Sequence, residues 1–354
     1  MGSSRTPTTK RLPGRVKAGM RLMEWLAATG MLAGACVGLI RGAILGPEYI
    51  AVAILKGVAL GVSLAALLGG IELIALHRLW RRLTLGRAVL VRTALYAPLA
   101  TVVYLAVSAA FSPWIEWSLQ RAMLLPALGI AVGGVLAGSI VMGLMRLLGF
   151  RVLRNLLSGR YHRPFEEERI FLFIDLVGST TIAERIGHLR YHSFLSDFIE
   201  GLEDPVLDHG GDVYQYVGDE VVVTWPLAGA RSNGRCIACN FAIVDAIERA
   251  RSRYEDLYGA VPTFRSGIHC GRVVAGEIGD QRTQIVFVGD VVNTASRMQA
   301  EAKAREKELV VSGALLARIN LPPEIEARLL EAVQPKGKEQ SIELFEVVRS
   351  TRTP

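Results

Sequence analysis

The sequence has few cysteines and few charged residues for its length. Its 354 residues include four cysteines, too few for a disulfide scaffold. Charged residues make up 21% and hydrophobic residues 51%, which excludes a largely disordered chain and is unusual for a soluble one. Cys236 and Cys239 form a CxxC pattern with no second pair, so we interpret them as part of a buried helix face. No A-x-A-like cleavage site follows the first apolar run, which favours a retained span over a signal peptide.

The excess of basic residues is confined to one half of the chain. Residues 1–165 contain 19 Lys/Arg and 4 Asp/Glu, a net charge of +15, whereas residues 166–354 contain 21 and 29, a net charge of −8. The basic half is also the apolar half. Its charge therefore indicates membrane topology rather than binding to a nucleic-acid backbone, and we expect no nucleic-acid partner.

Long apolar runs predict a transmembrane domain in the first half. Four runs occur there: Trp25–Ile40, Tyr49–Leu76, Thr93–Ile115 and Ala122–Met145. The last two have 23 and 24 residues without a charge, enough to cross a hydrocarbon core of roughly 30 Å. Basic residues alternate between the connections, so both termini are expected in the cytoplasm. We expect Lys56, inside the second run, to extend its amine to the membrane surface.

These features divide the chain into four parts. We expect a basic cytoplasmic tail at 1–22, a four-helix transmembrane domain at 23–148, a linker at 149–167 and an α+β domain at 168–350. In the last part, β-rich runs at 168–176, 212–217, 220–225 and 263–275 alternate with helical patterns after residue 178 and at about 230–258. The order β-α-β-β-α-β predicts a ferredoxin-like α+β sandwich, with further strands at 285–288, 309–312 and 341–348.

Two aspartates are placed where this layout would bring them together. Asp175 ends the first strand, and Asp219 lies in the two-residue turn between the second and third strands. Two carboxylates at one sheet edge form a credible site for Mg²⁺ and a polyphosphate, with amides of Gly178, Ser179 and Thr180 directed at phosphate oxygens. The alternative is that Asp175 and Asp219 serve only as a helix cap and a turn residue. Ser179 or Thr180 is expected to cap the following helix, and Asp290 a later one.

Three motifs in this half resemble the class III nucleotidyl cyclases. They are FIDLVGST at 173–180, VGDE at 217–220 and GDVVNTASR at 289–297. The similarity spans about residues 168–348, and the apolar half is compatible with membrane-anchored bacterial members of the family. The resemblance therefore implies an enzyme of the inner (plasma) membrane that forms a cyclic nucleotide and pyrophosphate from a nucleoside triphosphate.

The resemblance also implies roles for individual residues. Asp175 and Asp219 would hold two Mg²⁺ or Mn²⁺ ions, which the backbone carbonyl of Leu176 would also contact. The enzyme would be a head-to-tail homodimer with active sites at the interface. Asn293 and Arg297 would come from the partner chain and stabilise the transition state, and their spacing of four places both on one helix face.

Other positions match the family's substrate-binding residues less well. Lys336 matches a lysine that contacts the terminal phosphates, and Lys338 is the weaker candidate. Gln215 and Val286 occupy the two base-reading positions, yet neither is the usual residue of an adenylyl or a guanylyl cyclase. Gln215 can both donate and accept hydrogen bonds, whereas Val286 can do neither. We expect ATP as the substrate, with a guanylate cyclase or a catalytically silent nucleotide-binding sensor as alternatives.

Overall fold

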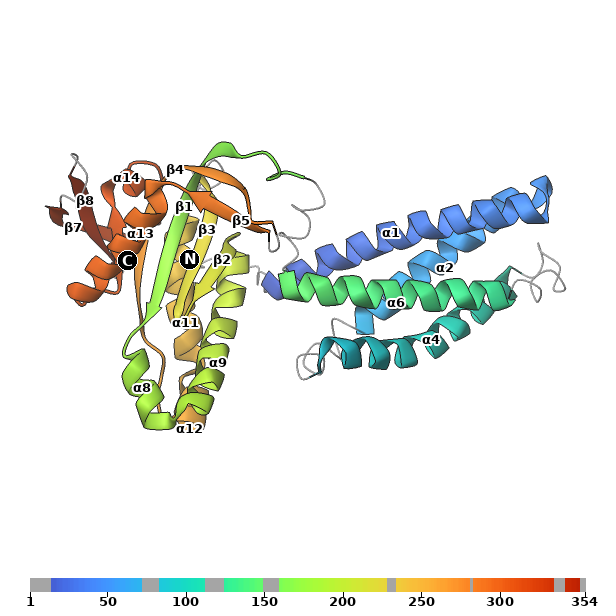
Figure 1. Ribbon diagram of the computed structural model, residues 1–354, viewed down its shortest axis with the longest axis horizontal. Helices are drawn as coiled ribbons and strands as arrows, with labels where there is room; N and C mark the ends of the chain where they lie inside the picture. The colour runs from blue at the N-terminus through green and yellow to red at the C-terminus, as the bar shows by residue number, and fades with distance from the viewer. Residues whose placement is uncertain are drawn as a thin grey trace, which may run out of the picture. The chain divides into compact units, whose positions relative to one another are not determined.

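The computed structural model describes residues 14–71, 83–111, 124–148, 159–227, 234–280, 283–333 and 341–350 (Figure 1). The chain divides into two compact units, with a boundary between Ser158 and Gly159.

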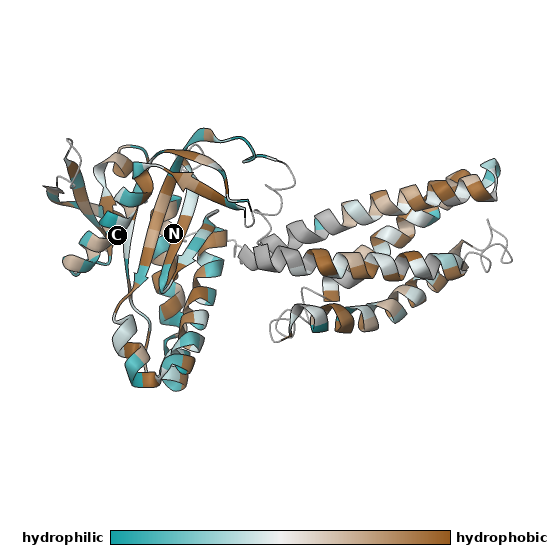
Figure 2. Ribbon diagram, viewed as in Figure 1, coloured by the Kyte–Doolittle hydropathy of each residue, from teal (hydrophilic) through white to brown (hydrophobic). Residues whose placement is uncertain are grey.

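Long helices form the N-terminal unit. They are α1 (Gly14–Leu45), α2 (Ile50–Ile71), α4 (Leu85–Ala110) and α6 (Leu124–Leu148), with a short 3₁₀ turn, η1, at Pro47–Tyr49. Within the described residues, three apolar segments are long enough to cross a membrane: Ala27–Ile44, Pro47–Leu67 and Gly86–Ala110. In α6, the described apolar stretch is shorter, at Val132–Val141. Large apolar side chains such as Leu32, Leu90 and Leu125 are exposed, and Figure 2 shows hydrophobic residues along these helices, as expected of surfaces that face lipid.

Glycines allow α1 and α2 to pack with their backbones in contact. A Cβ on Gly34 would lie 2.0 Å from the carbonyl oxygen of Gly57, and one on Gly61 would lie 1.9 Å from that of Gly30. Small residues at such positions are typical of helix pairs in membranes.

The position of Lys56 differs from the expectation. The residue is only 6% exposed, and its amine lies 5.3 Å from the centre of the Tyr104 ring on α4. A cation–π contact inside the helix bundle therefore replaces the expected extension of the amine to the surface.

An eight-stranded mixed sheet forms the C-terminal unit. Its strands are β1 (Phe165–Leu176), β2 (Asp212–Val217), β3 (Glu220–Pro226), β4 (Phe264–Ile278), β5 (Gln284–Val288), β6 (Leu309–Ser312), β7 (Ile325–Val333) and β8 (Ile342–Arg349). The spatial order is β2-β3-β1-β4-β6-β8-β7, and β5 pairs with β4. The order β2-β3-β1-β4, antiparallel throughout, is that of a ferredoxin-like core, so the predicted fold class is confirmed.

Helices cover both faces of this sheet (Figure 1). On one face are α8 (Ser179–Ile186), α9 (His188–Asp208), α11 (Arg235–Arg249) and α12 (Arg251–Tyr258); on the other is α13 (Asp290–Ala304). The central strand β1 is buried on both faces because alternate side chains enter two different cores. Ile170 and Ile174 pack with α9 and α11, whereas Phe171 and Phe173 belong to the core under α13 and β5.

Several boundaries and small elements differ from the sequence prediction. β1 begins at Phe165, three residues early, and the predicted helix 230–258 divides at Ala250 into α11 and α12, with 228–233 outside the described residues. Neither β7 nor the short helix α14 (Gly313–Leu316) was predicted. The interpretation of the CxxC pattern is confirmed: Cys236 and Cys239 are both fully buried on α11, and burial raises the pKa of the Cys236 thiol to about 12.

Candidate functional site

Asp175 and Asp219 meet at one edge of the sheet, as the sequence predicts. Asp175 lies near the end of β1, directly opposite Glu220, the first residue of β3. Asp219 precedes Glu220 in the tight turn from β2. Gly218 adopts a φ of 65° in that turn, a conformation that glycine tolerates without strain. The hairpin thus places Asp219 beside the end of β1.

The two aspartates lie in a region of concentrated negative charge. Burial raises the pKa of Glu220, and the negative charges of Asp175 and Asp219 raise it further. The pKa of Tyr191, on α9, is also raised, first by burial and then by Asp219 and Asp175. Three carboxylates therefore concentrate negative charge at this edge, which favours the binding of a cation.

A cationic side chain of the same chain is already present there. The ammonium group of Lys303, in the last turn of α13, donates a hydrogen bond of 2.8 Å to Oδ2 of Asp175. The bond to Asp175 raises the pKa of Lys303. Sequence reasoning missed this residue, because no local pattern places it beside a strand 128 positions earlier.

The helix after Asp175 begins differently from the prediction. Gly178 is the N-cap of α8, with a φ of 68°, and no side chain caps the helix. Ser179 and Thr180 are therefore the first two helical residues, and the prediction that one of them is the cap was wrong. The physical reason is that glycine adopts the left-handed conformation that the turn requires. The first N–H groups of α8 have no acceptor within the helix. A phosphate site at this point would need such N–H groups as donors.

Asn293 and Arg297 lie on the exposed face of α13. The opposite face, which includes Val291, Ala295 and Met298, is buried against the sheet. Within the described residues, Arg297 makes neither a hydrogen bond nor an ion pair. The structure thus places both residues away from their own sheet, where a second chain could meet them.

The start of α13 also corrects one prediction. The N-cap is Gly289 and not Asp290, which is the first residue of the helix. The carboxylate of Asp290 instead accepts a hydrogen bond of 3.3 Å from Oγ1 of Thr294 within the helix.

The two predicted base-reading residues lie on different strands. Gln215 is exposed on β2, and Val286 is half-buried on β5 opposite Gly276. The residues next to them in the sequence contact each other, because the backbone N–H of Phe287 donates a hydrogen bond of 3.4 Å to the hydroxyl of Tyr214. The predicted phosphate-binding residues Lys336 and Lys338 lie outside the described residues.

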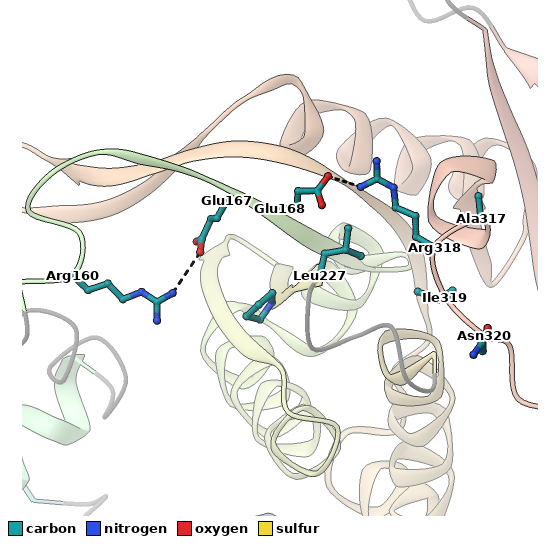
Figure 3. Close-up of a pocket in the computed structure, with 9 residues that line it drawn as sticks. Arg160, Glu167, Glu168, Leu227, Ala317, Arg318, Ile319 and Asn320 are labelled. Atoms are coloured by element: carbon teal, nitrogen blue, oxygen red, sulfur yellow. Dashed lines mark hydrogen bonds and ion pairs between the residues drawn. The ribbon is translucent and has the colours of Figure 1, made fainter.

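A separate pocket occurs at the opposite end of β1. It measures about 970 Å³ and is lined by Arg160, Glu167, Glu168, Arg318 and neighbouring residues (Figure 3). Glu168 and Arg318 form an ion pair of 2.6 Å across it. None of the predicted site residues that the structure describes lines this pocket. The candidate site is instead an open sheet edge within one chain.

The residues at this edge fit a divalent cation. Among the described residues, no group of three or more His, Cys, Asp and Glu side chains is arranged as a closed metal cage. Mg²⁺ does not need one, because it commonly binds through one or two carboxylates, water and substrate phosphates. The ammonium of Lys303, which is hydrogen-bonded to the Asp175 carboxylate, shows that this position can accommodate a cationic group.

Comparison with known families agrees with the motifs. The model of the family described as "Adenylate and Guanylate cyclase catalytic domain" matches residues 162–347, just over half of the chain. The chain belongs to this family. The resemblance stated from the three motifs is therefore confirmed, and the C-terminal unit is a cyclase domain.

Relatives agree with this assignment, and a solved structure shares the fold. The chain is 39% identical over 222 residues to adenylate cyclase 2 of Rhizobium meliloti, covering 62% of this chain and 61% of the relative. It is 28% identical over 208 residues to adenylate cyclase 1 of the same organism, covering 57% of this chain and 31% of that relative. The chain thus spans less than two thirds of their lengths. A bacterial light-regulated adenylyl cyclase structure has the same fold, with a TM-score of 0.52 at 18% identity, covering 65% of this chain and 67% of that one.

Proposed function

We propose that the chain is an integral-membrane adenylate cyclase that converts ATP into 3′,5′-cyclic AMP and pyrophosphate. The observation that carries the proposal is a division of the site. Asp175 and Asp219 gather at one sheet edge, whereas Asn293 and Arg297 project from a helix face that turns away from their own sheet. One chain therefore offers two half-sites, and a head-to-tail homodimer would join each pair of aspartates to the partner's Asn293 and Arg297.

The reaction requires one bond to form and one to break at the α-phosphorus. The 3′-oxygen of ATP attacks this phosphorus, the bond to the bridging oxygen breaks, pyrophosphate leaves and the hydroxyl proton passes to water. Asp175, Asp219 and the carbonyl of Leu176 would hold two Mg²⁺ or Mn²⁺ ions. When bound, these ions supply a lower pKa for the 3′-hydroxyl and charge neutralisation for the leaving group.

The chain's own residues orient and stabilise the rest of the substrate. Amides of Gly178, Ser179 and Thr180 at the start of α8 donate to phosphate oxygens. The guanidinium of Arg297 donates to the oxygens on which negative charge grows, and Asn293, on the same helix face, helps to stabilise this transition state. Lys336 neutralises the terminal phosphates.

The N-terminal unit is proposed to anchor the enzyme in the plasma membrane. Three apolar helices of sufficient length support this role, and we propose α6 as the fourth span. The basic segments that flank the apolar runs support a cytoplasmic location for both termini and the cyclase domain.

The base of the substrate is proposed to be adenine. ATP is supported by the relatives named adenylate cyclase. GTP is the second candidate. Gln215 can donate hydrogen bonds to either purine base and accept hydrogen bonds from it, and Val286 forms no hydrogen bond that would favour one base. Guanylyl cyclase C of Rattus norvegicus is 32% identical over 139 residues, so this chain is also similar to a guanylyl enzyme.

Mixing two inactive variants tests the shared site. Asp175→Ala and Arg297→Ala should each abolish cyclic AMP formation, because each removes a part that both sites of a homodimer need. Co-expression of the two should restore activity, because a hybrid dimer contains one intact site. Asp175→Ala mixed with Asp219→Ala is the control and should stay inactive, since both changes affect the same half-site. Hybrid dimers without activity would contradict the shared site.

The same samples distinguish a silent sensor from an enzyme. A sensor would bind ATP, measured by equilibrium dialysis, yet release neither cyclic nucleotide nor pyrophosphate under any of these conditions.

A further inference from the structure

The contact between Lys303 and Asp175 joins an exposed, flexible lysine side chain to a largely buried carboxylate. Asp175 lies near the end of the interior strand β1, between Glu220 on β3 and Arg265 on β4. Its side chain is 15% exposed, whereas that of Lys303 is 61% exposed. A lysine side chain on four methylene groups can turn into solvent without moving its helix. The carboxylate therefore stays in place when the ammonium leaves.

The position of Lys303 on α13 directs it toward its own chain. It follows the buried residue Ala302 and precedes the end of the helix at Ala304. Arg297 occupies the face opposite the buried side, whereas Lys303 lies on the flank and reaches β1. The same helix thus carries a residue that contacts its own aspartate and two that project outward.

The ammonium and a divalent cation need the same carboxylate. Oδ2 of Asp175 accepts the hydrogen bond of Lys303, and the negative charges of Asp219 and Glu220 act on the same ammonium. A cation bound between Asp175 and Asp219 would lie close to this positive charge and would be repelled by it.

We propose that Lys303 is an internal counter-ion that competes with the divalent cation for Asp175. The proposal rests on the proposed function, since it assumes that Asp175 is a metal ligand. In the absence of metal, Lys303 compensates the clustered carboxylates; when metal binds, its ammonium gives up the hydrogen bond. The residue would therefore set the metal concentration that the enzyme requires.

The test is Mn²⁺ binding to the full chain in detergent without nucleotide, measured from the electron paramagnetic resonance signal of free Mn²⁺. Removing the charge with Lys303→Gln should lower the Kd for Mn²⁺ about three- to fivefold, the size expected for a partly exposed charge contact. Lys303→Arg keeps the charge and should stay within about twofold of the unmodified chain.

A matched control lies four residues further along the chain. Lys307 forms a comparable ion pair of 3.2 Å with Glu346, away from the aspartates. Lys307→Gln should leave the Kd unchanged. Asp175→Asn should abolish the Mn²⁺ binding with which Lys303 competes. This loss would identify Asp175 as part of the Mn²⁺ site.

The outcomes separate the two claims. If Asp175→Asn removes Mn²⁺ binding but Lys303→Gln leaves the Kd unchanged or raises it, the counter-ion role is overturned while the metal site stands. If no Mn²⁺ binding responds to Asp175→Asn, the counter-ion role is overturned. The metal-dependent function is tested separately by cyclic AMP formation with metal and ATP, because substrate phosphates complete the coordination of the ion. If Lys303→Gln and Lys307→Gln lower the Kd for Mn²⁺ equally, the effect is due to the net charge of the chain. That result would also overturn the proposal.

Discussion

Replacing Gly267 by alanine should push α13 away from the sheet. Gly267 lies on β4 beneath this helix, and a Cβ there would lie 2.0 Å from the backbone nitrogen of Gln299 and 2.5 Å from the carbonyl carbon of Met298. An ordinary contact needs at least about 3.4 Å. Because both neighbours are backbone atoms, no side-chain rotation can relieve the clash, and the helix has to move by about 1.4 Å.

The displacement should affect stability and activity together. Overpacking of a core costs typically 1–3 kcal/mol, and the rigid neighbours place Gly267→Ala at about 3 kcal/mol. For a domain of this size, that lowers the Tm by roughly 6–12 °C. Asn293, Arg297 and Lys303 move with the helix, and a misplacement of about 1 Å can cost on the order of 100-fold in rate.

Scanning calorimetry of the full chain in detergent, together with cyclic AMP formation at 20 °C, measures both effects. Two further glycine-to-alanine variants provide a graded comparison. At Gly271 the nearest atom is a methyl group of Val291 at 2.6 Å, which can rotate, so the loss should be smaller. At Gly201, on α9, the nearest atom is the hydroxyl of Tyr254 at 3.6 Å, and alanine should stabilise by about 0.5 kcal/mol. A Gly267→Ala chain as stable as the Gly201→Ala chain would refute the reasoning.

Three further predictions follow from other parts of the molecule. The buried thiols of Cys236 and Cys239 have raised pKa values, so neither should react with a thiol-specific disulfide reagent at pH 8 until the chain is unfolded; fast reaction of both would contradict their burial. Gly34→Val should separate α1 from α2 and lower the yield of detergent-stable protein, whereas Gly138→Val on α6, where a Cβ meets nothing within 4 Å, should not. Arg297→Lys should lower kcat at least about 100-fold with an unchanged Tm, because lysine keeps the positive charge but lacks the planar guanidinium group with its paired N–H donors. A parallel fall in Tm would indicate a structural role.

The arrangement of the two aspartates could be predicted because it depends on local signals. A strand that ends at Asp175 and a Gly-Asp turn between two β-rich runs suffice to place both carboxylates at one edge of a ferredoxin-like sheet. The buried CxxC pattern was predictable for a similar reason, since helical spacing alone places Cys236 and Cys239 on one face.

Features that depend on backbone conformation or distant contacts could not be predicted in the same way. Gly178 takes the cap position that Ser179 or Thr180 was expected to hold, because the left-handed turn there decides where α8 begins. β7 was missed because its sequence, IEARLLEAV, also fits a helical pattern, and its strand form depends on pairing with β8. Lys303 was missed because only the packing of α13 on the sheet brings it to Asp175.

We propose that this chain forms a cyclic nucleotide from ATP. The most direct measurement is product analysis of the purified full-length chain with Mn²⁺, offered ATP and GTP in separate reactions. We predict cyclic AMP and equimolar pyrophosphate from ATP, and little or no cyclic GMP from GTP. Cyclic GMP from GTP alone would contradict the assigned substrate, and absence of product from both nucleotides with folded, dimeric protein would contradict the catalytic function itself.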